Sequence, residues 1–324
     1  MRVSPVLAAG CAALLSLPSC ATIKHSAVDA VSTAIAGYDK KGVPVARQTT
    51  PEAVLAVTGE TDTTLAAGFF PAALKLHDML RASNPAHIGF AESTGAYHVI
   101  YANAFIQADA ETLPVSRYDE QRAEFARAKM HYLRGRDDIL GALGRKYPRF
   151  REDIASGDAA RIGRAAARLS ADDVNAAYWA GAGWLGAFSL DPLDDSLLGT
   201  ANGAVALLER AAALEPEYGN GAAWNVLCAF YAAAPADFGG NAARARFCYE
   251  ESLRISKGKL PDPYVVYAQS LCVPANDSAG FAEALGKALA VSPDDMPDSR
   301  LSTVIMQKKA QWLLEHREDY FIDW

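Results

Sequence analysis

The chain has 324 residues and a formal net charge of −7, with 51% hydrophobic and 21% charged residues. The acidic balance argues against a nucleic-acid partner, which requires a basic face. The hydrophobic content is sufficient for a sizeable core, in either two globular domains or one helical array. Because alternating runs of Val, Ile and Thr are nearly absent, we expect an all-α protein.

The chain begins like a secretory leader. Its apolar stretch, Val3 to Leu17, is shorter than the about 20 residues that a stable membrane span requires. Leu17-Pro18-Ser19-Cys20 resembles a bacterial lipobox. We therefore predict a lipoprotein signal peptide at residues 1–19 and lipidation of Cys20. The alternative is an ordinary secretory peptide with an incidental cysteine.

We expect three segments in the chain. After the signal peptide, residues 20–48 form the lipidated N-terminus and a first amphipathic helix that ends near Gly37. Residues 49–324 form a single helical-repeat domain, giving roughly 11–13 helices in all. Ala21 in place of Asp after the cysteine favours the outer membrane, on the periplasmic face of the cell envelope.

The first half of the helical-repeat domain shows helix boundaries. Thr50-Pro51-Glu52 is typical of a helix start. Phe69-Phe70-Pro71 predicts an interruption or restart in a helix that ends at Asn84-Pro85. Long helices are then predicted from about Ile88 to Asp109 and from about Ser116 to Leu143. These helices form one or two degenerate pairs of the same array.

A packing pattern recurs three times in the second half of the chain. The first helix of each unit reads large-x-x-medium-small-x-x-large, and the second steps by four and three residues to a small one. The matching sets are Tyr178, Gly181, Ala182 and Leu185 with Ala204, Leu208 and Ala211; Trp224, Leu227, Cys228 and Tyr231 with Ala245, Tyr249 and Ser252; and Tyr264, Tyr267, Ala268 and Leu271 with Phe281, Leu285 and Ala288. This spacing predicts a tetratricopeptide-like α-α superhelix, with a generic all-α bundle as the alternative.

The pattern also assigns large residues to the core. We expect Trp224, Tyr231, Tyr249 and Tyr267 to be core residues rather than site residues. Three cysteines remain after the leader and the lipid site: Cys228, Cys248 and Cys272. An odd number is no disulfide framework. A bridge between the first two and buried free thiols are both open.

Motifs that resemble catalytic or cofactor sites have structural interpretations. Gly181-Ala-Gly183-Trp-Leu-Gly186 is a literal G-x-G-x-x-G, but a helix capped at Ser170 to Asp173 runs into it. We interpret its glycines as small residues at a helix contact, or as a lining that leaves room beside Trp184. The four Asp-Asp pairs are interpreted mainly as helix caps. The six histidines lack metal-ligand spacing, so we predict no metal, no cofactor and no catalytic constellation.

Two sets of residues are candidates for binding. Aromatic residues flanked by glycine and alanine could line a ligand cavity with apolar walls: Tyr97, Tyr101, Phe105, Tyr178, Trp179 and Trp184. The same rings would also serve as ordinary core. Arg161, Arg164 and Arg168 share one helical face and are either a solvated face or a docking patch for an acidic partner or lipid headgroups.

The chain resembles the T-component of TRAP-type transporter systems (TatT), a family of bacterial lipoproteins. The resemblance spans most of the mature chain. It rests on Pro71-x-x-Leu74, Asn84-Pro85, Tyr101-Ala102-x-Ala104-Phe105, Gly239-Gly240 ahead of Ala245 to Leu253, Tyr267-Ala268, Arg300-Leu301, Lys308-Lys309-Ala310-x-Trp312-Leu313-Leu314 and Tyr320-Phe321.

The resemblance implies a homotrimer of all-α subunits, each with an internal hydrophobic channel. It also implies pairing with a periplasmic solute-binding P-component, and a protein that is not an enzyme. The alternative is a general tetratricopeptide-like lipoprotein scaffold for envelope protein assembly. A third interpretation, an α-barrel hydrolase, has no support from the residues.

Overall fold

The computed structural model describes residues 29–30, 32–34, 36–45 and 52–321. The predicted signal peptide at 1–19, the predicted lipidation site Cys20 and the predicted helix start at Thr50 lie outside the described residues. Residues 29–30, 32–34 and 36 are helical, and the chain turns at Gly37 with a φ of 72°. This agrees with the expected first helix.

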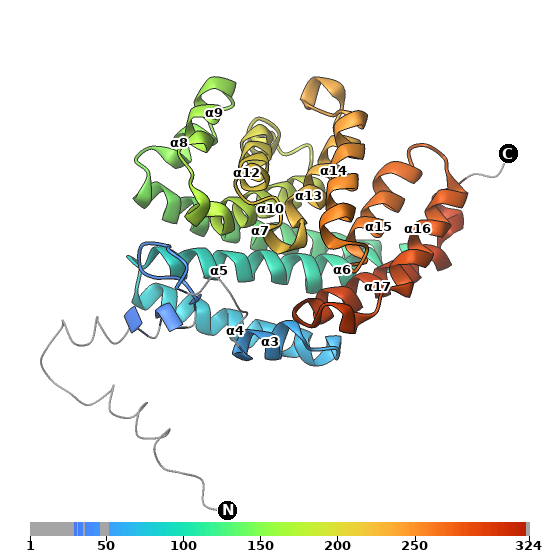
Figure 1. Ribbon diagram of the computed structural model, residues 1–324, viewed down its shortest axis with the longest axis horizontal. Coiled ribbons are helices and arrows are strands. Elements are labelled where there is room, and N and C mark those ends of the chain that lie inside the picture. Colours follow the sequence, from blue (N-terminus) through green and yellow to red (C-terminus); the bar gives the residue numbers. More distant parts are fainter. Residues whose placement is uncertain (1–28, 31, 35, 46–51, 322–324) are drawn as a thin grey trace, which may run out of the picture.

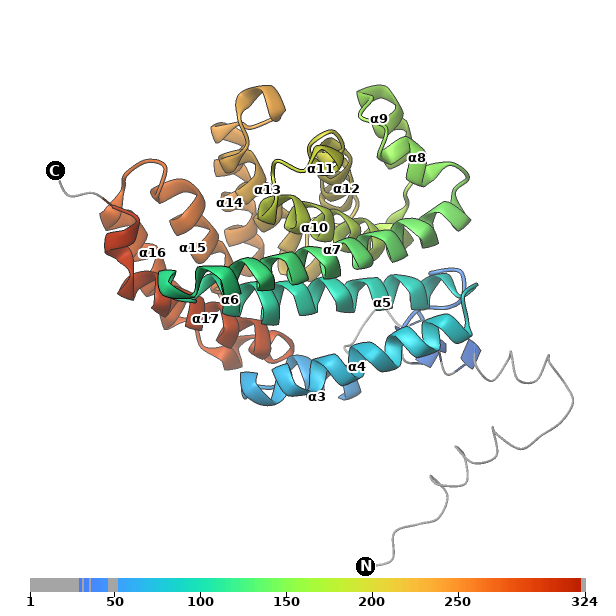
Figure 2. The same cartoon turned by 180° about the vertical axis from the view of Figure 1, so that it is seen from behind.

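From residue 52 to residue 321 the chain is built of helices, so the all-α prediction is confirmed (Figures 1 and 2). The described residues contain no β-strand beyond an isolated bridge between Tyr38 and Pro44. The helices are α3 (Glu52–Thr58), α4 (Thr63–Ser83), α5 (Ile88–Tyr101), α6 (Ala108–Glu111), α7 (Tyr118–Lys146), α8 (Phe150–Ile154), α9 (Ala159–Ala167), α10 (Val174–Leu190), α11 (Asp195–Leu198), α12 (Ala201–Leu214), α13 (Ala222–Ala233), α14 (Ala242–Ser256), α15 (Asp262–Tyr267), α16 (Ser278–Ala290) and α17 (Arg300–Glu315). Two π-helical segments, η1 (Ala102–Gln107) and η6 (Ala268–Cys272), continue α5 and α15.

The helices pack in consecutive pairs, as the repeat pattern predicts. α10 packs on α12, α13 on α14, and α15 with η6 on α16, while α5 and α7 form a further pair ahead of them. The first helices α5, α10, α13 and α15 also contact one another in chain order, so they form one continuous layer. This is the arrangement of a tetratricopeptide-like array.

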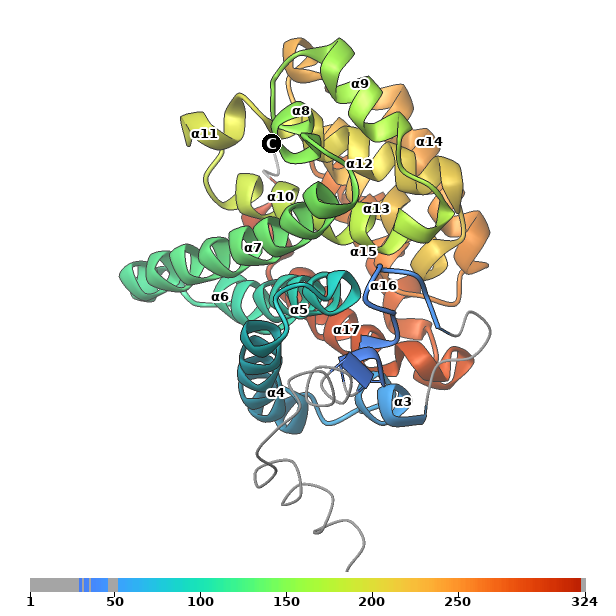
Figure 3. The ribbon, with the colours of Figure 1, turned by 90° about the vertical axis from the view of Figure 1, so that its left-hand side faces the viewer.

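The last helix closes the array onto its first elements. α17 contacts α3 and α4 as well as α15. In Figures 1 and 3 the red C-terminal helices lie beside the blue N-terminal ones. Lys308 Nζ donates to Thr63 Oγ1, and Lys309 Nζ lies 2.9 Å from Glu111 Oε2. Polar contacts therefore join segments from opposite ends of the domain.

Glycines allow α5, α7 and α10 to approach one another closely. A Cβ atom at Gly95 of α5 would lie 2.6 Å from the carbonyl oxygen of Gly135 of α7. A Cβ atom at Gly181, Gly183 or Gly186 of α10 would lie 2.7 Å from an atom of α12, α5 or α7, respectively. The G-x-G-x-x-G run is therefore a helix contact within α10, as interpreted from the sequence.

The aspartate pairs fall at helix starts in three of the four cases. Ser170 and Asp173 form a complete capping box ahead of α10. Asp194 accepts from the backbone of α11 at 2.9 Å, and Asp294 lies in a 3-10 turn. The pair at 137–138 lies instead inside α7, where both carboxylates form ion pairs with arginines.

α4 differs from its prediction, because it runs without a break from Thr63 to Ser83 with Pro71 inside it. Proline removes a helix hydrogen bond, which normally kinks or ends a helix. Pro71 is exposed, whereas Phe70 and Leu74 beside it are each 3% exposed. Burial of the adjacent apolar side chains therefore holds the helix together across the missing bond.

Of the four aromatic residues that we predicted to be core residues, one is fully buried. Tyr231 is 2% exposed, whereas Trp224, Tyr249 and Tyr267 are partly buried and pack against the core from its edge. Trp224 uses its exposed edge to donate from Nε1 to the carbonyl oxygen of Pro216 at 3.1 Å.

The cysteines after the predicted lipid site are free thiols. All three are buried: Cys228, Cys248 and Cys272. Burial raises the pKa of Cys228 to about 12 and that of Cys248 to about 11, so neither forms a reactive thiolate at neutral pH. The alternative of buried thiols is thus the one that the structure supports.

We predict that Gly203→Ala strongly destabilises the fold. The new Cβ would lie 2.1 Å from the carbonyl oxygen of Ile154, and a backbone atom cannot move aside as a side chain can. The free energy of unfolding should fall by about 3 kcal/mol, at the upper end for overpacking. Chemical denaturation measures the change. Gly163→Ala, a helical site with no neighbour within 4 Å of the new Cβ, is the control and should be neutral or stabilising. Equal losses in both variants would contradict the close packing.

Candidate functional site

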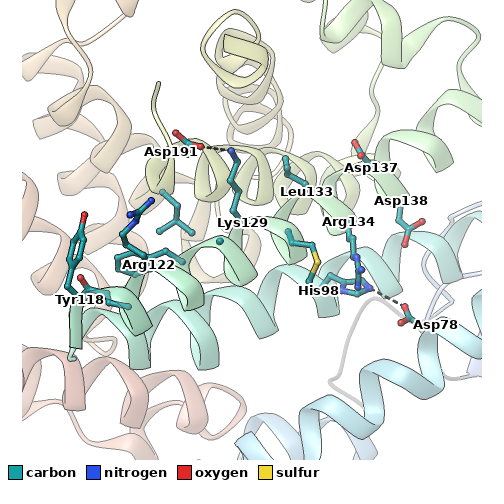
Figure 4. Close-up of a pocket in the computed structure, with 15 residues that line it drawn as sticks. Asp78, His98, Tyr118, Arg122, Lys129, Leu133, Arg134, Asp137, Asp138 and Asp191 are labelled. Atoms are coloured by element: carbon teal, nitrogen blue, oxygen red, sulfur yellow. Dashed lines mark hydrogen bonds and ion pairs between the residues drawn. The ribbon is translucent and has the colours of Figure 1, made fainter. Parts of the chain in front are cut away.

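A groove of about 1160 Å³ runs along one face of α7 (Figure 4). We call it the α7 groove. It lies between α7, residues of α4 and α5, and the end of α10. Its lining residues are Asp78, His98, Tyr118, Gln121, Arg122, Phe125, Ala126, Lys129, Met130, Leu133, Arg134, Asp137, Asp138, Leu190 and Asp191.

The α7 groove combines paired charges with exposed apolar groups. Lys129 Nζ lies 2.7 Å from Asp191 Oδ2 and 2.7 Å from Asp194 Oδ2, which ties α7 to the loop after α10. Tyr118 is 57% exposed and Met130 is 40% exposed. An exposed face of this composition is suited to contact with another protein rather than to enclosure of a small molecule.

A chain of buried polar groups forms one end of the α7 groove. His98 Nε2 lies 3.1 Å from Asp78 Oδ1, and His98 Nδ1 lies 2.9 Å from Nδ1 of His131. Burial lowers the pKa of both histidines, that of His131 to about 4, so both rings are neutral at pH 7. One ring then donates to the other.

This Asp-His-His chain resembles the orienting half of a nucleophilic triad. Within the described residues, neither His98 nor His131 hydrogen-bonds to a Ser, Thr or Cys side chain. The ring of Tyr101 packs edge-on against His131, with centroids 5.1 Å apart. The chain of polar groups therefore joins α4, α5 and α7 and lacks a nucleophile.

A second candidate site lies on the layer of first helices. We call it the aromatic recess and define it by Tyr178 and Trp179 of α10, Tyr218 ahead of α13, and Asp262 at the start of α15. The ring centroids of Tyr178 and Trp179 are 4.8 Å apart, and those of Tyr178 and Tyr218 are 5.3 Å apart. The hydroxyl of Tyr218 donates to Asn175 Oδ1 at 2.8 Å.

The three rings are partly exposed, but the hydroxyl groups of the two tyrosines are buried. Tyr178, Trp179 and Tyr218 all remain partly exposed. Burial nevertheless raises the pKa of the Tyr178 and Tyr218 hydroxyls well above their usual range. The rings of Tyr178 and Tyr218 are therefore partly exposed, whereas protein surrounds their hydroxyl groups.

Asp262 adds a carboxyl group to the aromatic recess. Its charge is close enough to Tyr178 to contribute to the raised pKa of that hydroxyl. Burial raises the pKa of Asp262 itself to about 6. Among the residues that the structure describes, no lysine or arginine forms an ion pair with Asp262.

The segment 36–45, which we call the strap, adjoins the aromatic recess. Tyr38 on the strap acts electrostatically on Tyr218. Burial, followed by the charges of Glu92 and Glu215, raises the pKa of Tyr38 to about 12. A Cβ atom at Gly42 of the strap would lie 3.0 Å from Glu92 Oε1, so the strap covers this carboxyl group.

Glu92 is an uncompensated buried acid. It is 1% exposed, and its Oε2 atom has no hydrogen-bond partner in the structure. Burial raises the pKa of Glu92 to about 8, so the side chain is largely protonated at neutral pH. An isolated buried carboxylate is unstable unless it is paired, which explains the retained proton.

The six aromatic residues proposed from the sequence fall into two groups. Tyr178 and Trp179 belong to the aromatic recess. Tyr101, Phe105 and Trp184 are at most 9% exposed and lie in the core. Tyr97 packs between Phe70 and His77, at centroid distances of 6.1 and 4.3 Å. None of the six lines the α7 groove.

Residues that the sequence analysis missed complete the aromatic recess. Tyr218 and Asp262 come from different repeat units, and Tyr38 from the strap. The only signal for Asp262 is that an acid follows Pro261 at a helix start, which is typical of many helices.

The three predicted docking arginines lie on or beside α9. Arg161 pairs with Asp153 at 2.8 Å. Arg168 donates to the carbonyl oxygen of Pro148 at 2.9 Å, and Arg164 and Arg168 are exposed. The structure thus places these arginines on or directly after α9, and none of them lines the α7 groove.

The described residues contain no group of three or more His, Cys, Asp or Glu side chains arranged to hold a metal ion. Among the helices that the structure describes, none has the length and apolar content needed to span a membrane.

Comparison with known proteins gives two matches. A family model described as TRAP transporter T-component matches residues 59–321. The chain is also 41% identical over 266 residues to an uncharacterized protein of Treponema pallidum (strain Nichols), and the match covers 82% of each chain. The family match spans α4 to α17 and so includes both the α7 groove and the aromatic recess.

The free energy of unfolding of the wild type should decrease as the pH rises, and we predict that Glu92→Gln abolishes this decrease. The pKa of Glu92 is about 8 in the folded chain and 4.5 without the fold, so the unfolded chain loses this proton first. The free energy of unfolding of the wild type therefore contains a term that falls as the pH rises from 4.5 to 8. Gln cannot ionise, so the variant should exceed the wild type at pH 8 by about 1 kcal/mol or more.

Urea denaturation at several pH values measures this difference. Glu318→Gln, a change at an exposed glutamate, is the matched control and should follow the wild type. Parallel pH profiles for wild type and Glu92→Gln would show that Glu92 is ionised in the folded chain.

Proposed function

Because the chain belongs to the TRAP transporter T-component family, we propose that it serves a TRAP-type transport system as a non-catalytic protein that binds a hydrophobic or amphipathic small molecule. Family membership makes it a transport-associated protein of the cell envelope. The ligand, the pairing with a periplasmic solute-binding protein and the assembly as a homotrimer are our additions.

The observation that carries the proposal is the aromatic recess. Its three rings are partly exposed, and burial of the Tyr178 and Tyr218 hydroxyls raises the pKa of both groups. Sites for small molecules are mostly apolar hollows with few polar groups, and the recess has this composition. The layer of first helices that carries it is the surface on which helical arrays commonly bind their ligands.

The proposed partner and the other subunits of a trimer need surfaces of their own. The α7 groove supports this part of the proposal, because it is large and presents exposed Tyr118 and Met130 beside paired charges. The exposed face of α9 with Arg161, Arg164 and Arg168 is a further candidate for contact with an acidic partner.

A general scaffold for envelope proteins is the second candidate function. The exposed α7 groove is the observation that favours it, since a scaffold needs protein-binding faces and no ligand recess. The two functions differ in whether a small molecule is bound.

The proposed location is the periplasmic face of the cell envelope, with a lipid anchor at Cys20 and a preference for the outer membrane. It rests on the lipobox-like Leu17-Pro18-Ser19-Cys20. Stable anchoring requires more than one acyl chain, which lipoprotein processing supplies.

Native mass spectrometry of protein purified from its own cells tests the ligand. We expect a bound small molecule in the wild type and less of it in Trp179→Ala, because the ring forms one wall of the recess. Trp224→Ala is the matched control, since Trp224 is also partly buried but lies outside the recess and should leave the bound mass unchanged. Absence of any bound molecule from the wild type, with partner proteins still co-purifying, would favour the scaffold.

Lipidation has a separate test. Mass spectrometry of the membrane fraction should show an acylated N-terminus at Cys20, and Cys20→Ser should release the protein into the soluble periplasmic fraction. Recovery of unmodified wild-type chain in that soluble fraction would refute the anchor.

A further inference from the structure

We propose that α4 carries a membrane-contact surface, a stripe of exposed apolar side chains that lies against the phospholipid bilayer to which the chain is tethered. We call it the α4 stripe and define it by Leu65, Phe69, Ala72, Leu76 and Met79. This inference rests on the proposed lipid anchor at Cys20, and it adds a second contact with the same membrane.

The spacing of these residues makes them one continuous surface. They follow one another in steps of four, three, four and three residues, which keeps their side chains on a single face of a helix. Leu65 is 60% exposed, Phe69 50%, Leu76 53% and Met79 63%. The stripe is about 21 Å long at the helical rise of about 1.5 Å per residue.

The opposite face of α4 already has its partner, because Ala66, Phe70, Leu74 and His77 are buried. α4 runs along the outer edge of the molecule, on the side opposite to α9 and α14 (Figures 1 and 2). The helix is therefore apolar on two faces, and the described residues of the chain cover only the inner one. A contiguous exposed apolar surface marks a contact with a protein or with a membrane.

The start of the described chain places α4 near the predicted anchor. The side chain of Asn84, the C-cap residue of α4, donates to Asp29 Oδ1 at 2.7 Å. Asp29 follows Cys20 by nine residues, and a segment of this length spans at most about 32 Å. An acylated Cys20 would therefore hold this end of α4 within that distance of the bilayer surface. The distance is comparable with the length of α4 itself, about 31 Å.

The charged side chains within α4 are all paired. Lys75 Nζ lies 2.7 Å from Asp78 Oδ2, and Arg81 lies 3.2 Å from Asp138 Oδ1. Contact with a bilayer would therefore depend on apolar area, as for other helices that lie in the membrane interface, and not on anionic lipids.

A second copy of the chain is the other occupant that an apolar stripe could have. A specific protein–protein interface buries about 800 Å² on each partner and involves about 20–30 residues on each side. The α4 stripe supplies five residues of one helix, which are too few to hold two copies together on their own. A tethered chain has no such requirement at a membrane, because the anchor keeps the stripe at high local concentration beside the lipid.

The first test removes the anchor and so measures the stripe alone. Flotation with phosphatidylcholine vesicles should show binding of the Cys20→Ser chain, with no change on adding phosphatidylglycerol or salt. Adding Leu65→Gln and Leu76→Gln should lower the bound fraction at least about fivefold, because glutamine removes apolar area but retains helix propensity. Phe247→Gln is the matched control, since Phe247 of α14 is also 53% exposed, and it should leave the bound fraction unchanged.

The second test uses the acylated chain in the same vesicles, with a fluorophore on Leu76→Cys. Cys228, Cys248 and Cys272 are buried thiols and stay unlabelled. Phospholipid brominated on its acyl chains should quench this label at least about twofold more than a label on Phe247→Cys, the matched control.

Thermal melts followed by circular dichroism establish that the variants fold. Absence of vesicle binding by the Cys20→Ser chain, or equal bound fractions with and without the two glutamines, would overturn the inference and leave the anchor intact. A chain without acyl groups at Cys20 would refute the anchor, and flotation would still decide on the stripe. Shielding of the label on Leu76→Cys from aqueous iodide without quenching by brominated lipid would make the stripe an interface between copies and overturn the membrane assignment.

Discussion

Close contact among α5, α7 and α10 is the constraint on which the rest of the structure depends. Gly95 and Gly135 remove the side chains that would hold α5 and α7 apart, and Gly183 brings the backbone of α10 against the Tyr132 carbonyl of α7 and the Val99 side chain of α5. Such contact fixes the rotation of α10 about its own axis. The small residues of α10 lie against neighbouring helices, whereas its Tyr178 ring packs against Trp179 and Tyr218.

Three acids in this fold, two of them buried, illustrate how the surroundings decide whether a carboxyl group is charged. Asp173 is 1% exposed, yet hydrogen bonds from Lys146 at 2.6 Å and Tyr147 at 2.7 Å outweigh burial and lower its pKa. Among the described residues Glu92 Oε2 has no hydrogen-bond partner, and burial raises the pKa of Glu92 to about 8, whereas burial raises that of Asp262 to about 6. The compensated acid caps a helix, whereas the two uncompensated ones lie under the strap and in the recess.

The architecture was predictable from the sequence because it depends on local spacing. The large-medium-small offsets around Tyr178, Trp224 and Tyr264 placed three helix pairs correctly, since both helices of a pair are close in the chain. Pro71 led to the wrong prediction of an interrupted helix. The sequence does not show that Phe70 and Leu74 are buried deeply enough to hold α4 together.

The aromatic recess was predictable only in part, for the same physical reason. Tyr178 and Trp179 are adjacent and were proposed together. Tyr218 and Asp262 reach them only through the stacking of successive pairs, a tertiary relation that spacing within one pair does not encode. Trp184, which shares a helix with the two predicted rings, faces the core at 1% exposure because of the rotation that the glycines impose.

The contact of α17 with α3 and α4 has a consequence for how the chain folds. Open repeat arrays unfold gradually, because each repeat depends only on its neighbours. Here Lys308 bonds to Thr63, 245 residues away, and Lys309 pairs with Glu111, 198 residues away. Both ends of the array are therefore engaged, and neither terminal repeat is free to fray while the other stays ordered. Closing a loop of this length slows the last step of folding. The closed array should therefore unfold cooperatively in heat or denaturant, rather than melt repeat by repeat.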